Sequence, residues 1–160
     1  MDDFEVWYRR HHRPVLASLT ALSGDIDVAR EATDEAFARA LAAWDQVVDF
    51  DSPTGWVYRV AVNVLRRIKR RRALEQRLVS RQDSASTDEL PHPELWEAVR
   101  SLPARQRTAV VLRYVADLPE ADIATAMGTT RSTVSSTLFD ARQRLTELLG
   151  AESETTEVST

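Results

Sequence analysis

The feature that most constrains the fold of this 160-residue chain is the helical spacing of its apolar residues, which recurs in nearly every segment. Only 4 glycines interrupt the sequence, and it is dominated by Ala, Leu, Arg and Glu, which favour helices. β-Branched residues rarely alternate with polar residues, as they would in a half-buried strand. The sequence therefore predicts an all-α fold.

A change of composition divides the chain. Residues 79–94 are rich in Ser, Asp, Thr and Pro and contain too few apolar residues to bury. We interpret them as a flexible linker between two small helical domains, residues 1–78 and 95–149. The hydrophobic fraction of 43% is sufficient for a core in each domain. Residues 150–160 contain no basic residue and show no helical period, so we expect a disordered tail.

The first part of the N-terminal domain, residues 4–22, has apolar residues at helical spacing. We expect two helices joined near His12. Pro14 suits the first turn of the second helix, because the missing N–H has no partner there, and Gly24 suits its end.

A longer amphipathic helix is predicted over residues 26–44, with apolar residues on one face and charged residues on the other. Residues 45–55 carry turn formers and no helical period, so they are predicted to form a loop. The next helix is expected to begin at Trp56, with Ser52 or Thr54 as its cap.

Composition also excludes several classes of function. The chain has 0 cysteines, which removes disulfides, thiolate zinc sites and cysteine nucleophiles. Its 3 histidines, His11, His12 and His92, do not stand at ligand spacing with carboxylates, and there is no glycine-rich phosphate loop. We therefore expect no metal, no cofactor and no enzymatic activity.

The N-terminus is acidic where a secretory signal is basic, and no apolar run approaches the roughly 18 residues that span a bilayer. These features predict a cytoplasmic protein without membrane insertion. The formal net charge is −4, so any surface for nucleic acid must come from a local concentration of basic residues.

Such a concentration occurs on the helix predicted from Trp56. One face is apolar, while polar residues gather on the opposite face within a sector of roughly 60°, taking 100° per residue. Further cations follow in the run 66–72. The candidate nucleic-acid surface comprises Trp56, Arg59, Asn63, Arg66, Arg67, Lys69 and Arg70.

A solvated helix face, balanced by acids elsewhere, is the competing interpretation of this run. The apolar opposite face forces the arginines to project outward together, and a polyanion would relieve their mutual repulsion. Trp56 and Tyr58 offer flat surfaces of the kind that stack on unpaired bases, although Trp56 can equally close the core.

Residues 117–145 have the spacing of a helix-turn-helix. Ala124 stands where the two helices would cross, Gly128 in the turn and Val134 inside the second helix, which Thr130 is expected to cap. A helical hairpin with a glycine cap is the alternative. The candidate duplex-reading residues are Thr130, Arg131, Ser132, Ser135, Ser136, Phe139 and Arg142.

Motifs in both domains follow a familiar order. Residues 29–37 read Ala-Arg-Glu-Ala-Thr-Asp-Glu-Ala-Phe, and residues 56–63 read Trp-Val-Tyr-Arg-Val-Ala-Val-Asn before the basic run. They resemble the patterns Ala-Glu-Asp-Leu-Val-Gln-Glu-Ala-Phe and Trp-Leu-x-x-Ile-Ala-x-Asn of the extracytoplasmic-function (ECF) sigma factors in the sigma-70 family. The second domain follows the same family order with Leu102-Pro103, Ile123-Ala124, Gly128 and Thr133-Val134-x-Ser136-x-Leu138-x-x-Ala141-Arg142.

The resemblance covers residues 4–78 and 95–149 and implies a sigma factor for promoter recognition, DNA melting and transcription initiation. Glu31, Asp34 and Glu35 would bind the clamp helices of the RNA polymerase β′ subunit. The predicted loop and the basic face would open and hold the downstream promoter element. The region 4-like second domain would read the upstream element as duplex and contact the β-subunit flap. An anti-sigma factor is a further possible partner, and the free chain is expected to be a monomer.

The chain also departs from the family pattern. Ser135 and Thr137 stand where the family usually has Lys and Arg, and Asp140 stands where it has Arg. Fewer cations on the recognition helix imply fewer phosphate contacts, and so either weaker binding to the upstream element or recognition of a divergent sequence. Arg67 replaces a common Asp, and Asp34 replaces a glutamine in the docking motif.

Two alternatives remain open. A regulator of duplex DNA would use the helix-turn-helix without core polymerase, residues 1–78 would dimerise or sense a signal, and its site would be palindromic. It leaves the separate basic helix unexplained. A polymerase-interaction module that does not bind DNA is the second alternative.

Overall fold

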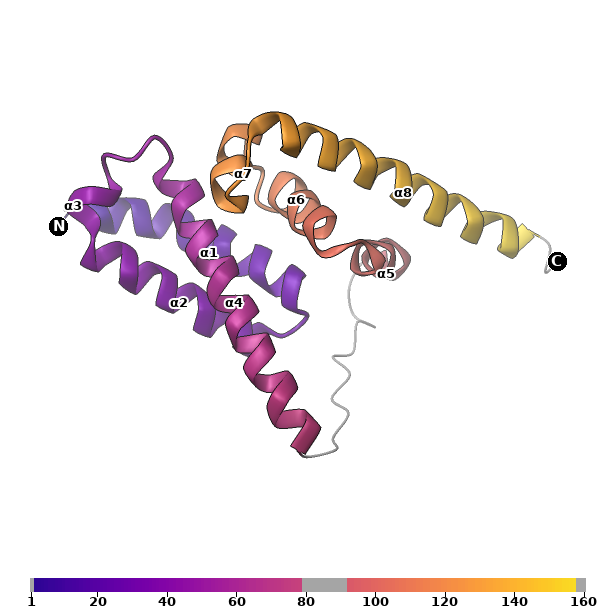
Figure 1. Ribbon diagram of the computed structural model, residues 1–160, viewed down its shortest axis with the longest axis horizontal. Coiled ribbons are helices and arrows are strands. Elements are labelled where there is room, and N and C mark those ends of the chain that lie inside the picture. Colours follow the sequence, from indigo (N-terminus) through magenta and orange to yellow (C-terminus); the bar gives the residue numbers. More distant parts are fainter. Residues whose placement is uncertain (1, 79–91, 158–160) are drawn as a thin grey trace.

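The computed structural model describes residues 2–78 and 92–157, which form eight helices and no strand (Figure 1). The predicted all-α fold is confirmed. Residues 79–91 of the predicted linker lie outside the described residues. The helices are α1 (Asp2–Ser23), α2 (Ile26–Ala42), α3 (Trp44–Val47), α4 (Pro53–Leu78), α5 (Pro93–Ser101), α6 (Ala104–Tyr114), α7 (Glu120–Met127) and α8 (Arg131–Glu157).

Helices α1, α2 and α4 pack against one another as a first body. Each of these helices has apolar residues at helical spacing, which form one face of the helix. That face packs against the other two helices. The Asp25 carboxylate caps α2 by accepting hydrogen bonds from the N–H groups of Asp27 and Val28. The Ser52 hydroxyl, one of the two predicted caps, caps α4 by accepting from the N–H of Gly55 at 2.9 Å. The largest buried side chains here are Val15, Leu19, Val47, Val57, Tyr58, Val64 and Ile68.

Helix α1 is continuous, so the prediction of two helices joined near His12 was wrong. A proline inside a helix removes one backbone hydrogen bond and costs about 3 kcal/mol. Ring contacts at i,i+4 support the turn before Pro14: Trp7 with His11 at 5.3 Å and Tyr8 with His12 at 4.9 Å between centroids. The packing of these rings outweighs the tendency of Pro14 to interrupt a helix.

The connection between α2 and α4 contains more helix than predicted. Trp44–Val47 forms the short helix α3, and α4 begins at Pro53 and not at Trp56. Proline is favourable in the first turn because its fixed φ matches the helix and it lacks an N–H that would need a partner. The helix therefore starts directly after its cap, Ser52.

Helices α5 to α8 form the second body. Helix α5 begins at Pro93, two residues before the predicted start of the second domain at 95. Helices α6, α7 and α8 pack on one another, and α5 packs against α6 and α8. The core residues exposed by no more than 1% are Leu102, Ala109, Val111, Leu112, Ile123, Val134, Leu138 and Ala141.

Helix α8 continues to Glu157, so the predicted disorder is wrong for residues 150–157. Extending an existing helix fixes one residue for each new hydrogen bond and avoids the cost of nucleation. Gly150 costs about 1 kcal/mol in a helix, and the Ala and Glu residues that follow favour it. Residues 158–160 lie outside the described residues.

The two bodies lie against each other, with α7 packed on α4 (Figure 1). The two bodies approach closely at Gly55, where a Cβ would lie 2.8 Å from Thr125 Cβ and 2.9 Å from Asp122 O of α7, and 2.6 Å from Ser52 Oγ of its own body. Only glycine allows this approach of the two backbones. The buried apolar residues of both bodies form one continuous core.

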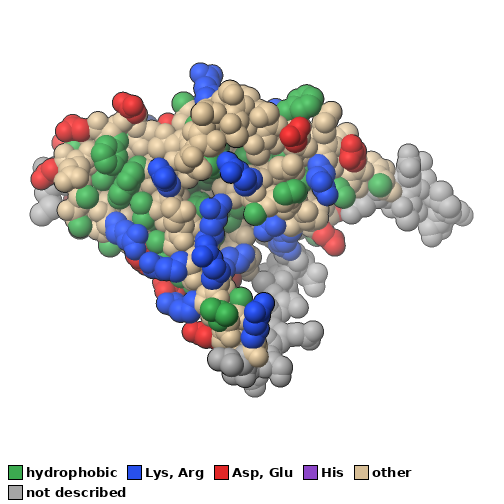
Figure 2. Space-filling model, in the orientation of Figure 1, with side chains coloured by type: hydrophobic (Ala, Val, Ile, Leu, Met, Phe, Trp, Pro, Cys, Tyr) green, Lys and Arg blue, Asp and Glu red, His purple; other side chains and the backbone are tan. Residues whose placement is uncertain are grey.

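None of the described helices combines the length and the apolar character that a membrane crossing requires. Within the described ranges, no three His, Asp or Glu side chains converge as the ligands of a metal ion would. Figure 2 shows instead that Lys and Arg side chains gather over α4.

Candidate nucleic-acid interface

Helix α4 carries the polar face predicted from the sequence. Arg59, Asn63, Arg66 and Arg70 are all exposed, and we call these four residues the α4 strip. The opposite face of the helix, which includes Val57, is buried in the core. Because the strip residues are three or four positions apart, they form one continuous line along the helix.

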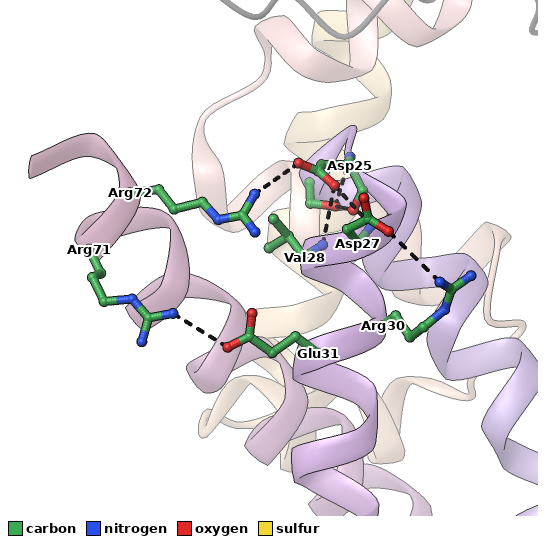
Figure 3. Close-up of polar contacts among 8 residues, drawn as sticks. Asp25, Asp27, Val28, Arg30, Glu31, Arg71 and Arg72 are labelled. Atoms are coloured by element: carbon green, nitrogen blue, oxygen red, sulfur yellow. Dashed lines mark hydrogen bonds and ion pairs between the residues drawn. The ribbon is translucent and has the colours of Figure 1, made fainter. Parts of the chain in front are cut away.

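Not every cation of the basic run faces away from the protein. Three of them pair with acids of α2: Arg67 with Glu35 at 2.7 Å, Arg71 with Glu31 at 3.4 Å and Arg72 with Asp25 at 3.1 Å. Figure 3 shows Arg71 reaching from α4 toward Glu31 and Arg72 reaching toward Asp25, the residue that caps α2. The run therefore has two sides, and Arg67, a predicted DNA contact, lies on the side that faces α2.

The three acids predicted to bind polymerase all lie on α2, and each faces a basic group. Asp34 lies 3.4 Å from the imidazole of His12, and Glu31 faces Arg71. Glu35 accepts two hydrogen bonds from Arg67, at 2.7 and 2.9 Å. The hydrogen bond from Arg67 is the main reason that the pKa of Glu35 lies below its usual value. All three carboxylates remain accessible, with 30% to 63% of each side chain exposed.

Lys69 extends from α4 toward the second body. Partial desolvation lowers the pKa of its ammonium group, and the positive charge of Arg107 lowers it further. Lys69 therefore lies near α6, apart from the line of the α4 strip.

Trp56, at the start of α4, is half-buried and packs against the core. Its ring centroid lies 6.1 Å from that of Phe50, whose side chain is 42% exposed. The ring therefore contributes to the core while a second aromatic beside it faces solvent.

The second body has helix-turn-helix geometry. Gly128 ends α7 in the left-handed conformation with φ of 62°, which favours glycine. Ala124 is 7% exposed and Val134 is fully buried. The N–H of Thr133 donates to Thr130 Oγ1 at 3.2 Å, so Thr130 caps α8 as predicted.

The predicted duplex-reading residues differ in their surroundings. Arg131 and Phe139 are 76% and 59% exposed, and Ser132 is also exposed. Ser135 Oγ donates a hydrogen bond of 2.6 Å to the Glu120 carboxylate, which comes from the first turn of α7. These residues share the N-terminal part of α8, the end that enters a major groove in this motif.

Two further candidates turn back onto the protein. Ser136 Oγ donates to main-chain carbonyl oxygens one turn earlier, those of Ser132 at 3.2 Å and Thr133 at 3.1 Å. Arg142 Nε donates to the Tyr114 hydroxyl at 2.6 Å. Both side chains have groups that DNA would have to share with these partners.

The α4 strip faces the helix-turn-helix across a narrow polar cleft of about 150 Å³. Arg59, Asn63 and Arg66 form one wall, and the end of α7 forms the other with Met127 and Gly128. The Arg59 guanidinium is only 3.4 Å from the place where a Cβ of residue 128 would lie. The structure thus places one predicted DNA-binding surface against the body that carries the other.

Several of these contacts have no signal in the sequence. The hydrogen bond of 2.8 Å from Ser52 to Asp122 joins residues 70 positions apart, and neither residue type is unusual at its site. An acid at Glu120 is ordinary at a helix start, where the helix dipole favours negative charge. Its contact with Ser135 depends on the angle between α7 and α8.

Models of known families match both bodies. The sigma-70 region 2 model matches residues 7–75, and the sigma-70 region 4 model matches residues 92–145. Two solved structures share the fold at 23% identity. The sigma factor RpoE of Bartonella quintana, in complex with the anti-sigma factor NepR, has a TM-score of 0.76 over 94% of this chain and 98% of that one. CnrH in complex with the cytosolic domain of CnrY has a TM-score of 0.63 over 92% and 88%.

Curated relatives are similar over most of their length. The RNA polymerase sigma-E factor of Streptomyces coelicolor is 30% identical over 154 residues, which cover 93% of this chain and 87% of the relative. The ECF RNA polymerase sigma factor SigE of Mycolicibacterium smegmatis is 28% identical over 98% of this chain and 65% of the relative. The chain therefore belongs to the ECF branch of the sigma-70 family, the RNA polymerase sigma factors that direct promoter recognition, DNA melting and transcription initiation.

Proposed function

We propose that the two bodies divide the work of promoter recognition. The α4 strip holds the opened downstream element, the N-terminal part of α8 reads the upstream element as duplex, and the acids of α2 bind the β′ clamp. One observation carries this proposal: an exposed basic helix face and a capped helix-turn-helix occur on separate helical bodies of one chain.

Electrostatics supports a strong dependence on polymerase. Each phosphate contact contributes about 0.7 to 0.9 to the logarithmic salt slope of binding, and the strip offers three arginines, Arg59, Arg66 and Arg70. The chain as a whole has a net charge of −4, which opposes binding to DNA. Weak contacts of two bodies become effective when core polymerase holds both on one DNA molecule.

DNA opening requires no nucleotide hydrolysis in this scheme. Unstacking costs a few kcal/mol per base and is offset by stacking on aromatic side chains and by pairing of phosphates with cations. Phe50 and the accessible part of Trp56 lie at the start of the strip and supply aromatic surface there. The protein then selects the opened state by binding it and catalyses no reaction.

The acids of α2 must exchange partners when they bind polymerase. Glu31 and Glu35 are paired with the exposed arginines Arg71 and Arg67, and exposed ion pairs contribute only about 0.2 to 1 kcal/mol each. A positively charged clamp surface can therefore replace Arg67 or Arg71 at little cost. The released arginines would then become available to DNA.

The second body has an apolar groove that fits the proposed contact with the β flap. The groove has a volume of about 270 Å³ and lies between α5, α6 and α8. An apolar segment of the flap would cover it. Its lining residues are Leu95, Trp96, Val99, Val110, Val111, Tyr114, Val115 and Leu145.

Separation of the two bodies would widen access to the α4 strip. The cleft beside the α4 strip measures about 150 Å³, less than the roughly 300 Å³ of a small ligand pocket. Arg59, Asn63 and Arg66 are exposed but share this cleft with the end of α7, which restricts the approach of a nucleic-acid strand from that side. We propose that core polymerase holds the bodies apart.

We further propose that the chain acts in the cytoplasm, is a monomer when free and is held by an anti-sigma factor. The structures of similar fold that contain the anti-sigma factor NepR or the cytosolic domain of CnrY support the last of these. Neither alternative function is favoured, because the family similarity extends over both bodies.

In vitro transcription tests the proposal directly. Core polymerase is supplied with a library of genomic fragments, with and without this chain, and the start sites are sequenced. We expect new start sites that share an upstream and a downstream element. Binding of the chain alone to a palindromic site as a dimer, without new start sites, would contradict the proposal and support a duplex regulator.

A further inference from the structure

Glu120 places a carboxylate in the middle of the proposed reading surface. It is the first residue of α7, and its side chain is 29% exposed. One of its oxygens, Oε2, accepts the hydrogen bond of 2.6 Å from Ser135 Oγ. The same oxygen lies 3.8 Å from Arg131 Nε. One acid from α7 thus contacts two residues that are one turn apart on α8.

This contact fixes what Ser135 can offer to DNA. A serine hydroxyl has one proton to donate and two lone pairs that accept hydrogen bonds. The proton points to Glu120, so the part of the hydroxyl that remains accessible can only accept. Without this partner, the serine hydroxyl would be able to form hydrogen bonds with donors and with acceptors.

The major groove distinguishes these two cases. Adenine N6 and cytosine N4 carry amino groups that donate hydrogen bonds there. Guanine N7 and O6 and thymine O4 only accept them. A serine restricted to accepting hydrogen bonds will therefore favour an amino group of adenine or cytosine and gain nothing from guanine or thymine.

Arg131 shares the same anchor. Its Nε lies 3.8 Å from Glu120 Oε2, a longer contact than the hydrogen bond from Ser135. A carboxylate this close to DNA phosphates would repel them, and the pairing with Arg131 offsets that repulsion. The three side chains therefore form one unit.

We propose that Glu120 is a specificity-determining residue, which takes the proton of Ser135 and so makes the upstream element carry an amino-bearing base, adenine or cytosine, opposite Ser135. Glu120 contacts Ser135 and Arg131 and acts on DNA through them, so it is a positioning residue. This inference rests on the proposed reading of the upstream element by α8.

The test uses holoenzyme, made from core polymerase and the full chain, on promoter fragments that vary at each base pair of the upstream element. Ser135→Ala identifies the base pair that Ser135 contacts, because preference should change at that pair. Single functional groups are then removed there with base analogues: purine for adenine, 2-pyrimidinone for cytosine, 2-aminopurine for guanine and 5-methyl-2-pyrimidinone for thymine.

Removal of the amino group should weaken binding of the wild-type holoenzyme roughly fivefold, as expected for one neutral hydrogen bond. The same removal should have no effect with Ser135→Ala. The effect of removing the carbonyl oxygen from the paired guanine or thymine should not depend on Ser135. With Glu120→Ala the hydroxyl proton is free, so the amino group should no longer be required.

Asp140→Asn is the control for loss of charge, because it removes one negative charge from an exposed position of α8. It should change affinity evenly at all bases and leave the amino-group effect intact. If Ser135 depends on the carbonyl oxygen, if Ser135→Ala changes no preference, or if Glu120→Ala acts evenly like the control, the inference is wrong. If the wild-type chain supports no initiation on any fragment, the proposed function itself fails, which is a separate result.

Discussion

The Ser52 hydroxyl donates a hydrogen bond of 2.8 Å to the Asp122 carboxylate and so joins the start of α4 to the first turn of α7. The same hydroxyl accepts from the N–H of Gly55, and it thereby caps α4 and contacts the second body at once. Because Gly55 lies in this contact without a side chain, the two helix starts approach closely. The arrangement that places α7 beside the α4 strip is thus anchored by ordinary residues of both bodies.

Gly55→Ala should separate the two bodies. The added Cβ would lie within 2.9 Å of Ser52 Oγ, Thr125 Cβ and Asp122 O, too close for real atoms, at a place where α4 meets α7. We expect a destabilisation of about 1 to 3 kcal/mol, typical of overpacking, and a longer distance between the bodies. The chain has 0 cysteines, so spin labels on two introduced cysteines at Val6 and Arg144 would report that distance without interference.

The control for this separation is Gly150→Ala, where an added Cβ meets no atom within 4 Å. It should leave the label distance unchanged and stabilise α8 slightly. An unchanged distance in Gly55→Ala as well would show that the contact between α4 and α7 adjusts without opening.

Arg66→Ala with Arg70→Ala should reduce open-complex formation and leave polymerase binding intact. Both residues belong to the α4 strip and face away from the core, so their loss removes positive charge offered to DNA. We expect a smaller salt dependence, by about 0.7 to 0.9 in slope for each lost phosphate contact. Permanganate footprinting measures opening, and native gel shifts with core polymerase measure binding.

Arg71→Ala with Arg72→Ala provides the matched comparison on the same helix. These cations pair with Glu31 and Asp25 of α2, so their loss should lower stability by up to about 1 kcal/mol per pair and affect opening less. Equal open-complex yields for the wild type and the Arg66 and Arg70 double variant would remove the strip from the DNA interface.

Glu35→Lys should weaken the binding of core polymerase. The substitution reverses a charge on the proposed docking surface and also places a cation beside Arg67. Because the pKa of Glu35 is lowered, its contribution to stability is present above the ordinary carboxyl pKa and disappears as the pH falls through the lowered value. A pull-down with core polymerase at neutral pH, with a thermal melt as control, measures the effect. Unchanged recovery of polymerase would place the docking surface elsewhere.

Tyr58 should make the fold sensitive to alkaline pH. Burial raises the pKa of its phenol to about 12, and the side chain is 1% exposed. The folded state then holds the proton more tightly than the unfolded state, so stability should fall as the pH rises from about 10 to about 12. The loss should reach about 2 to 3 kcal/mol, the free energy that corresponds to this difference in pKa between the two states. Denaturant melts at each pH should show a weaker decline in Tyr58→Phe; identical declines would assign the effect to other groups.

The sequence by itself determined the all-α fold, the position of most helices, the cap at Thr130 and the turn at Gly128, and it narrowed the cap of α4 to Ser52 or Thr54. These features depend on local spacing and on the bonding habits of single residues, which the sequence displays directly. It misplaced the break near His12 and the end of α8. In the first case, side chains one turn apart stabilise the helix across Pro14. In the second, the helix extends from a segment that is already formed.

Only the tertiary structure decided which charges are free. The basic run after Asn63 reads as a single array, yet Arg67, Arg71 and Arg72 point to α2 while Arg66 and Arg70 do not. Likewise, the sequence presents Ser135 as an ordinary polar residue, and the crossing of α7 over α8 gives it the Glu120 partner. A pairing between distant segments depends on helix directions and on the angle at which two helices meet. Those are set by the packing of the whole core, which no local pattern encodes.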